Sequence, residues 1–310
     1  MRSWAPVIVL GWACSTGGDP PPVRGANPEH VPSQPDSKRG AEPNIGSSTT
    51  GSTDGTAIES SATAAGGSGG SGGSSGADTP KPTALPAEPE AVELRAADGV
   101  VVHGLLHAAA ADRSAPIILL FHQAASNAAE YQPIAPRLAA LGYHALAIDQ
   151  RSGGRRFGRD NRTVQAKGKS TAFGPAYRDL TAALAWARER GHERVIVWGS
   201  SYSAALVFRL AAEHPDELAA VLAFSPGEYM GGKSTVARWA REVTVPVFVT
   251  SAPKEAEAAA AIALAVGEKA QQHVPAKGVH GSSILRPDRN PTGHQAVWTA
   301  VEAFLRRVTA

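Results

Sequence analysis

The sequence predicts an α/β fold, with a mostly parallel, twisted sheet, helices on both faces and an antiparallel hairpin at one edge. Apolar runs of strand length alternate with stretches of helical period along the C-terminal part of the 310-residue chain. Most of these apolar runs are continuous, as in strands that are covered on both faces. The pair Asp98-Gly99 lies between two short strand-like runs and predicts the hairpin turn.

The elements follow in a regular order. The predicted strands are Val100–Leu106, Ile117–Phe121, His144–Ile148, Arg194–Trp198, Leu218–Phe224 and Val245–Thr250. The predicted helices are Ala128–Leu141, Tyr177–Arg190, Ala204–His214, Ala256–Val266 and Thr292–Val308. Asn127 can cap the first helix, while Gly142 and Gly191 can end the first and the second. The last helix carries one apolar stripe, which consists of Val297, Val301, Phe304, Leu305 and Val308.

Composition separates this part from a long N-terminal segment. Between Ser15 and Pro89, 45 residues are Gly, Ser, Thr or Pro and none is aromatic, and Gly66–Gly76 contains only Gly and Ser. Such a segment cannot bury enough apolar surface to offset the entropy lost on ordering. We therefore expect a disordered linker over residues 15–90 and one folded domain over residues 91–310, a size that supports a full core.

The first fourteen residues predict export. Arg2 precedes the apolar stretch Trp4–Ala13, and Cys14, the only cysteine, follows directly before the linker. This arrangement resembles a bacterial lipoprotein signal, which implies a signal peptide over residues 1–14 and acylation of Cys14. The resemblance implies a lipid anchor in the bacterial cell envelope, at the outer membrane. Because Trp12 replaces the usual small residue, a secreted protein is the alternative.

Composition and motifs also exclude several classes of function. The 30 Lys and Arg residues nearly balance the 28 Asp and Glu, which argues against a dedicated nucleic-acid binder. A single cysteine excludes an intramolecular disulfide framework and a Cys-based zinc site. The glycines at 153 and 154 lack the spacing of a dinucleotide fingerprint. His103 and His107 would share a strand face, but no further metal ligands accompany them. We expect no cofactor, no metal and no nucleic-acid partner.

The strongest chemical signal is the turn that follows the strand at 195–198. Its sequence is GSSYS at 199–203, and a predicted helix begins at 204. This matches the nucleophile elbow G-x-S-x-G, with Ser203 in place of the last glycine. Small residues on both sides of the apex keep the strained turn free of clashes. Ser201 is therefore the candidate nucleophile, and a plain strand–turn–helix junction is the alternative.

With this motif, Val92–Val308 resembles the α/β-hydrolase superfamily, and within it the dienelactone-hydrolase-like branch of serine hydrolases. That family places an oxyanion-hole donor in a His-Gly-x loop after an earlier strand. Here the loop begins His122-Gln123-Ala124, with Gln123 in place of the glycine. The resemblance implies that the backbone N–H groups of Ala124 and Tyr202 form the oxyanion hole. We expect His122 to brace its loop rather than to react.

The same resemblance orders the triad as serine, acid and histidine. His280 lies in a glycine-flanked loop before the final helix, where the family places its base. His273, which precedes this loop, and His294, which opens the last helix, are the alternatives.

The acid is less clearly marked. The family's carboxylate stands about nine residues after the proline of the preceding strand, here Pro246, which points to Glu255. Glu257 is the first alternative, and an acid on the loop after Phe224 is the second. The structural interpretation is a surface glutamate in the first turn of a helix, where negative charge suits the helix dipole.

These residues predict a serine hydrolase that cleaves carboxylic esters through an acyl-enzyme intermediate. Hydrolysis of amides by the same triad, and an inactive exported binding domain, are the alternatives. The short segment Ser225–Thr244 leaves no room for a large lid, which suits small ester substrates. The loop Arg151–Arg178 holds eight Lys or Arg residues and one acid, Asp160. This loop is either simply solvated, or its positive charge attracts anionic substrates or lipid headgroups.

Overall fold

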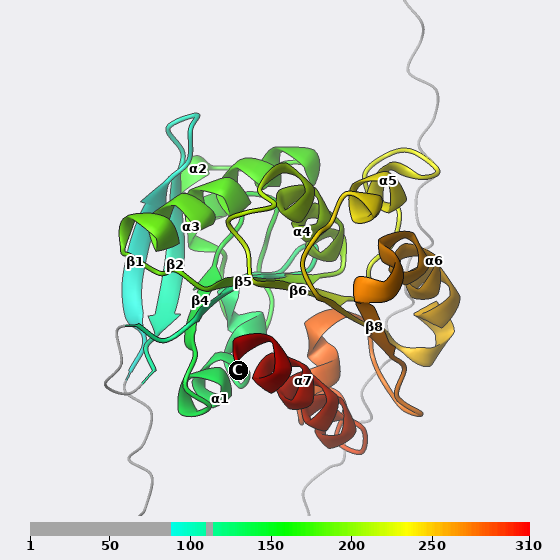
Figure 1. Cartoon of the computed structure of the whole chain (residues 1–310). Coiled ribbons are helices and arrows are strands. Elements are labelled where there is room, and N and C mark those ends of the chain that lie inside the picture. The colour runs from blue at the N-terminus through cyan, green and yellow to red at the C-terminus, as the bar shows by residue number, and fades with distance from the viewer. Residues whose placement is uncertain (1–87, 110–113) are drawn as a thin grey trace, which may run out of the picture. The chain divides into compact units, whose positions relative to one another are not determined.

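One eight-stranded sheet forms the centre of the folded part of the chain (Figure 1). The computed structural model describes residues 88–109 and 114–310, so Cys14 and the linker over residues 15–87 lie outside the described residues. All described residues belong to a unit that spans residues 77–310. The strands are β1 (Glu90–Arg95), β2 (Val101–His107), β3 (Ile117–Phe121), β4 (His144–Ile148), β5 (Val195–Ser200), β6 (Ala220–Phe224), β7 (Val247–Thr250) and β8 (Ala270–His273).

The strand order is β1-β2-β4-β3-β5-β6-β7-β8. β2 pairs antiparallel with β1 and with β4, and every other neighbouring pair is parallel. The hairpin turn lies where it is predicted, since the N–H of Gly99, at φ +81°, donates to the carbonyl of Ala96. This is the predicted α/β-hydrolase fold, with a parallel sheet and an antiparallel hairpin at its edge.

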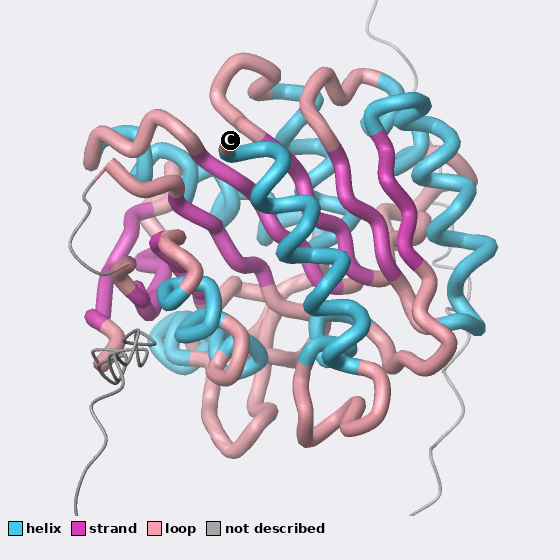
Figure 2. The backbone as a smooth tube through the Cα atoms, turned by 60° about the horizontal axis from the view of Figure 1, so that its bottom comes forward, coloured by secondary structure: helices cyan, strands magenta, loops and turns pink. Residues whose placement is uncertain are grey.

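Helices cover both faces of the sheet (Figures 1 and 2). They are α1 (Ala135–Ala140), α2 (Arg162–Lys167), α3 (Tyr177–Glu189), α4 (Tyr202–Glu213), α5 (Thr235–Arg241), α6 (Ala256–Val266) and α7 (His294–Thr309). Short 3-10 turns are η1 (Ala128–Tyr131), η2 (Gly174–Ala176), η3 (Pro253–Glu255), η4 (Gly267–Lys269) and η5 (Gly281–Leu285). Apolar side chains of α3 to α6 pack on one face, and those of α1 and α7 pack on the other. No helix in the described ranges is long and apolar enough to span a membrane.

The predicted helix Ala128–Leu141 is wrong as one continuous element. The structure has η1, then a break, then α1. Pro133 has no backbone N–H to donate and cannot continue a helix, which accounts for the break. The cap is confirmed, because Oδ1 of Asn127 accepts the N–H of Ala129 at 2.9 Å. Gly142, at φ +92°, is confirmed as the residue where the chain leaves the helix.

Because β3 to β7 run parallel, their carboxyl ends meet at one edge of the sheet, where ligands bind in folds of this class. The residues that follow them are His122, Asp149, Ser201, Ser225 and Ser251. Only α5 lies between β6 and β7, so the described chain carries no large lid at that position.

Candidate active site

Ser201 occupies the strained turn between β5 and α4. Its φ of +60° and ψ of −122° are unfavourable for a residue with a side chain. Its N–H donates to the carbonyl of Phe224 at 2.8 Å, which ties the turn to the end of β6. A Cβ at Gly199 would collide with the backbone of Ser203, so only glycine fits there. The turn thus has the form of a nucleophile elbow.

Ser203 shows why the last glycine of the motif can be replaced. Its hydroxyl donates to the carbonyl of His122 at 2.6 Å and accepts from the amide of Gln150 at 2.9 Å. The same amide donates to the hydroxyl of Tyr202 at 2.9 Å. The serine therefore ties the elbow to the loop after β3 and to the end of β4.

His280 and Glu255 lie together at this edge of the sheet. The Nδ1 atom of His280 is 2.9 Å from Oε1 of Glu255. The hydroxyl of Ser225 donates to Oε2 of Glu255 at 2.7 Å and accepts the N–H of Gly281 at 2.9 Å. Burial works to raise the pKa of Glu255, but the hydrogen bonds from His280 and Ser225 outweigh it, and the pKa lies below its usual value. The arrangement holds an ionised carboxylate against the imidazole.

The Ser201 hydroxyl is not hydrogen-bonded to His280 within the described chain. The hydroxyl of Tyr229, on the loop after β6, donates to the carbonyl of Ser225 at 3.2 Å. Burial raises the pKa of Tyr229, the charge of Glu255 adds to the rise, and a hydrogen bond with Ser201 opposes it. Catalytic hydrogen bonds are often long or poorly aligned before substrate binds.

The alternative acid and base candidates from the sequence do not contact the His280–Glu255 pair. Glu257 is exposed in the first turn of α6. His273 ends the edge strand β8, and Nδ1 of His294 contacts the carbonyl of Asn290 at 2.9 Å. Of the histidines considered as base, only His280 has a carboxylate partner in the described residues.

The two N–H groups expected to form the oxyanion hole belong to the elbow and to the loop after β3. Tyr202 is the first residue of α4, so its N–H has no acceptor within the helix. Ala124 follows Gln123, whose own N–H donates to Oε2 of Glu130 at 2.8 Å. The next residue, Ala125, has a φ of +52° and turns the loop sharply. Their role in binding an oxyanion stays a prediction.

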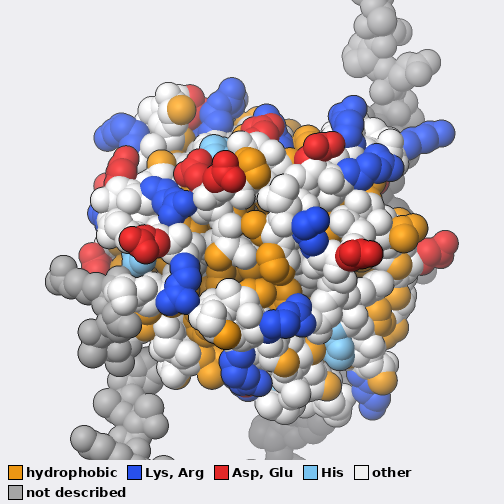
Figure 3. All heavy atoms as spheres, in the orientation of Figure 1, with side chains coloured by type: hydrophobic (Ala, Val, Ile, Leu, Met, Phe, Trp, Pro, Cys, Tyr) orange, Lys and Arg blue, Asp and Glu red, His pale blue; other side chains and the backbone are white. Residues whose placement is uncertain are grey.

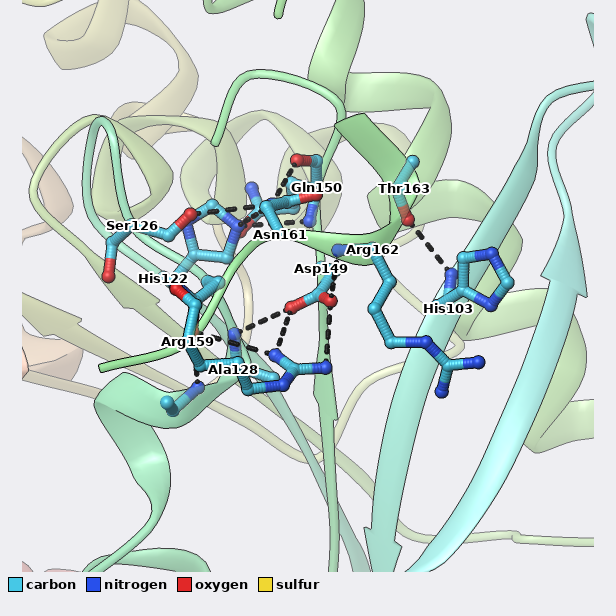
Figure 4. A network of polar contacts seen from close by, with 12 residues as sticks. His103, His122, Ser126, Ala128, Asp149, Gln150, Arg159, Asn161, Arg162 and Thr163 are labelled. Carbon is cyan, nitrogen blue, oxygen red and sulfur yellow. Dashed lines mark hydrogen bonds and ion pairs between the residues drawn. The ribbon is translucent and has the colours of Figure 1, made fainter. Parts of the chain in front are cut away.

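His122 is fully buried and braces this loop (Figure 4). Its Nε2 accepts the N–H of Gln150 at 2.9 Å, and its Nδ1 lies 2.8 Å from the carbonyl of Gln123. This pattern fits a neutral ring with the proton on Nδ1. Burial lowers the pKa of His122 to about 4, well below its usual 6.5. The ring supports the loop structurally, as expected.

Some of the basic residues in the loop after β4 pair with acidic residues, so this loop presents less unpaired positive charge than its composition suggests. Asp149, fully buried, accepts two bonds from the guanidinium of Arg159, at 2.8 and 2.9 Å, and one from the N–H of Ala128 (Figure 4). Arg151 is only 2% exposed and bridges Asp98 and Asp179.

The remaining basic residues of this loop lie nearer the surface. Arg155 pairs with Asp160, and Arg178 approaches Asp98. Arg156, Arg162, Lys167 and Lys169 form no ion pair with a described residue. On the face drawn in Figure 3, positive and negative side chains are interspersed.

In the described ranges, no group of three or more His, Cys, Asp or Glu side chains could hold a metal ion.

Ser225 and Tyr229 could not be identified from the sequence, because neither belongs to a motif. In the structure Ser225 directly follows β6 and has a φ of +53°.

Comparison with known families agrees with this geometry. The profile of the family described as serine aminopeptidase, S33, matches residues 112–275. The chain belongs to this family. The match includes Ser201 and Glu255 and ends before His280. No curated protein sequence matches the chain.

Solved structures show the same fold at low sequence identity. An esterase of Pyrococcus furiosus is 19% identical with a TM-score of 0.55, covering 76% of this chain and 96% of its own. A carboxyl esterase of Bacillus coagulans is 11% identical with a TM-score of 0.57, covering 72% of this chain and 99% of its own. A dienelactone hydrolase of Anabaena variabilis is 16% identical with a TM-score of 0.56, covering 71% of this chain and 97% of its own. At these identities the likeness shows the α/β-hydrolase fold, and membership of the serine aminopeptidase family indicates a hydrolase.

Proposed function

We propose that this family member is a serine hydrolase that cleaves carboxylic esters, with Ser201 as nucleophile, His280 as base and Glu255 as the acid that orients it. The observation that carries the proposal is the 2.9 Å contact between His280 and Glu255 beside the strained turn of Ser201. A histidine held by an ionised carboxylate, next to a serine at φ +60°, has the parts of an activated nucleophile.

The proposed reaction has two halves. Glu255 accepts a hydrogen bond from Nδ1–H of the imidazole and stays ionised, which leaves Nε2 free to take the proton of the Ser201 hydroxyl as its oxygen attacks the ester carbonyl. The N–H groups of Ala124 and Tyr202 stabilise the negative oxygen of the tetrahedral intermediate. The imidazolium then gives its proton to the leaving alkoxide. Water, deprotonated by the same imidazole, releases the acid and restores Ser201.

Hydrolysis of amides is the second candidate, because the family is described as serine aminopeptidases. The same groups would protonate an amine instead of an alkoxide. The similar structures favour the ester, since they are those of an esterase, a carboxyl esterase and a dienelactone hydrolase. The short segment between β6 and β7, with α5 as its single helix, leaves an open site that suits small acyl groups.

The experiment compares the full chain on p-nitrophenyl acetate, butyrate and decanoate with aminoacyl p-nitroanilides. Ser201→Ala serves as the blank. We expect turnover of the short esters that the blank lacks, and little cleavage of anilides. Preferential cleavage of anilides would make the protein an aminopeptidase. Equal turnover by the parent and the blank on every substrate would remove the serine mechanism.

We also propose that the chain is exported and lipid-anchored through Cys14, as its sequence predicts. The support is the position of the only cysteine after an apolar stretch and before a Gly/Ser-rich segment. Mass spectrometry of protein made in a bacterium with lipoprotein processing tests this. The expected mature N-terminus is lipid-modified Cys14, and an unmodified N-terminus elsewhere would indicate a secreted protein.

A further inference from the structure

Glu130, a carboxylate outside the proposed triad, is fully buried beside it. It lies in η1, after the loop that contains Ala124. Its Oε2 accepts the backbone N–H of Gln123 at 2.8 Å. Its Oε1 accepts the Gln123 side-chain amide at 3.1 Å and the hydroxyl of Ser200 at 2.7 Å.

The carboxylate of Glu130 has partners on two of the segments that carry the proposed catalytic groups, and one of these partners, Ser200, connects it to the third. Gln123 directly precedes Ala124, one expected oxyanion donor. Ser200 directly precedes Ser201, the proposed nucleophile. The Ser200 hydroxyl also accepts the N–H of Ser282, on the segment that follows His280, at 2.8 Å. One carboxylate thus connects the oxyanion loop, the elbow and the histidine loop.

The close approach of the histidine loop depends on Gly281, which has a φ of +66°. A Cβ at this position would collide with the hydroxyl of Ser200 and would lie 3.7 Å from Oε1 of Glu130. Glycine therefore lets the backbone next to His280 pack against the Ser200–Glu130 pair. The three segments meet without space for an additional atom.

All groups around Glu130 can donate, which fits an ionised carboxylate. Gln123 offers two N–H groups, and Ser200, already an acceptor for Ser282, has its own hydrogen left to donate. Burial raises the pKa of Glu130 above its usual value, although the bonds from Gln123 and Ser200 oppose that rise. Arg286 bonds to the backbone carbonyl of Glu130, at 2.9 Å, and its guanidinium also pairs with Asp288.

We propose that Glu130 is a positioning residue. Through Gln123 and Ser200 it holds the Ala124 N–H, the Ser201 hydroxyl and the His280 ring in fixed positions relative to one another. The proposal rests on the proposed function. Glu130 touches no substrate and acts only through its neighbours. A displacement of about 1 Å in such groups lowers turnover by up to ~100-fold.

The test uses Glu130→Gln and Ser200→Ala in the full chain, with Asp179→Asn as control. Glutamine keeps the shape but presents an NH₂ group where the carboxylate accepts. Ser200→Ala removes only the connection to the elbow and to Ser282. Asp179 is an equally buried acid that is bonded to Arg151 instead. Each variant is measured for kcat and KM on p-nitrophenyl acetate, for thermal midpoint, and for hydrogen exchange at the Gln123 and Ser282 amides.

We expect Glu130→Gln to lower kcat by about 10- to 100-fold with KM changed less than about threefold. Exchange should rise at both amides in Glu130→Gln and at Ser282 alone in Ser200→Ala. Asp179→Asn should lower the thermal midpoint without altering kcat in the folded protein. If Glu130→Gln does not fold, Ser200→Ala, with a smaller loss of kcat and the faster exchange at Ser282, is the deciding variant.

Parental kcat in Glu130→Gln, or unchanged exchange at both amides, would overturn the proposal. A loss of kcat in proportion to unfolded protein, equal to that of Asp179→Asn, would do so too. If the parent itself hydrolyses no ester, the proposed function fails, and the exchange pattern still shows whether Glu130 orders the two loops.

Discussion

The Nδ1 atom of His280 lies 2.9 Å from Oε1 of Glu255, and the other carboxylate oxygen is held at 2.7 Å by the hydroxyl of Ser225. Two donors therefore fix the plane of one carboxylate. A glutamate is longer than the aspartate usual in this fold, and Ser225 supplies a second bond that holds its extra length in place. The pKa of Glu255 lies below its usual value despite partial burial, so the acid is charged at neutral pH.

Glu255→Gln is expected to be severe, because a neutral amide neither stabilises the imidazolium nor fixes the tautomer that carries its proton on Nδ1. Loss of the orienting acid in a triad costs about 10⁴ in turnover. Glu257→Gln is the matched control, since Glu257 is exposed in the first turn of α6, two residues along the chain. Ester turnover of the two purified variants checks this. A reversed ranking would move the acid two residues along the chain.

Ser225→Ala removes the second bond to Glu255 and the acceptor of the Gly281 N–H. We expect about a tenfold loss of kcat, since a hydrogen bond to a charged group contributes roughly 1.5–3 kcal/mol and part of it is recovered by water. Ser251→Ala is the control: that serine is also buried at a strand end, but its hydroxyl has no partner among the described residues. Equal kcat for both variants would show that Ser225 does not hold the acid.

Arg151→Ala should destabilise the fold rather than alter the chemistry. Arg151 and Asp179 are 2% and 0% exposed, with 2.7 Å between Nη2 of Arg151 and Oδ1 of Asp179. Breaking such a pair leaves a buried unpaired charge and costs about 3–5 kcal/mol. Arg155→Ala, which breaks the pair with Asp160 at the surface, should cost less than about 1 kcal/mol. Urea unfolding measures both, and similar values would contradict the structural role of Arg151.

The lowered pKa of the buried His122 ring predicts that the folded protein loses stability in mild acid. The unfolded chain takes up a proton on this ring below its ordinary pKa of 6.5, whereas the buried ring resists protonation until about pH 4. Stability from this group is therefore complete above pH 6.5 and falls by roughly 3 kcal/mol as the pH drops to about 4. Unfolding free energy against pH should be less steep in His122→Asn. An unchanged slope would mean that the ring already titrates normally in the folded protein.

Much of the fold follows from hydrophobic patterning alone. β3 and β4 have the bounds predicted from their apolar runs, and α6 matches Ala256–Val266. The edge strand β8 was missed, because its sequence AQQH is polar and the strand is only half-buried. The helices α2 and α5 are too short to show a period. Short elements of this kind depend on tertiary packing more than on local sequence.

Part of the candidate site could be predicted in the same way. Ser201 and His280 lie in short motifs that can be recognised in the sequence by their small flanking residues. Glu130 and Ser225 lie in no such motif, because their roles arise only when loops distant in sequence meet at the sheet edge. The ion pairs of Arg151 could not be predicted either, because Asp98 and Asp179 are 53 and 28 residues away from it in the chain.

The central claim is that Ser201 is an activated nucleophile, and one measurement tests it most directly. The full chain is treated with a fluorophosphonate at neutral pH, digested, and the adduct is mapped by mass spectrometry, with Ser201→Ala and heat-unfolded protein alongside. The account predicts one adduct, on Ser201, absent from both controls. An adduct on Ser200 or Ser203, or no adduct on a folded protein that still turns over esters, would contradict it.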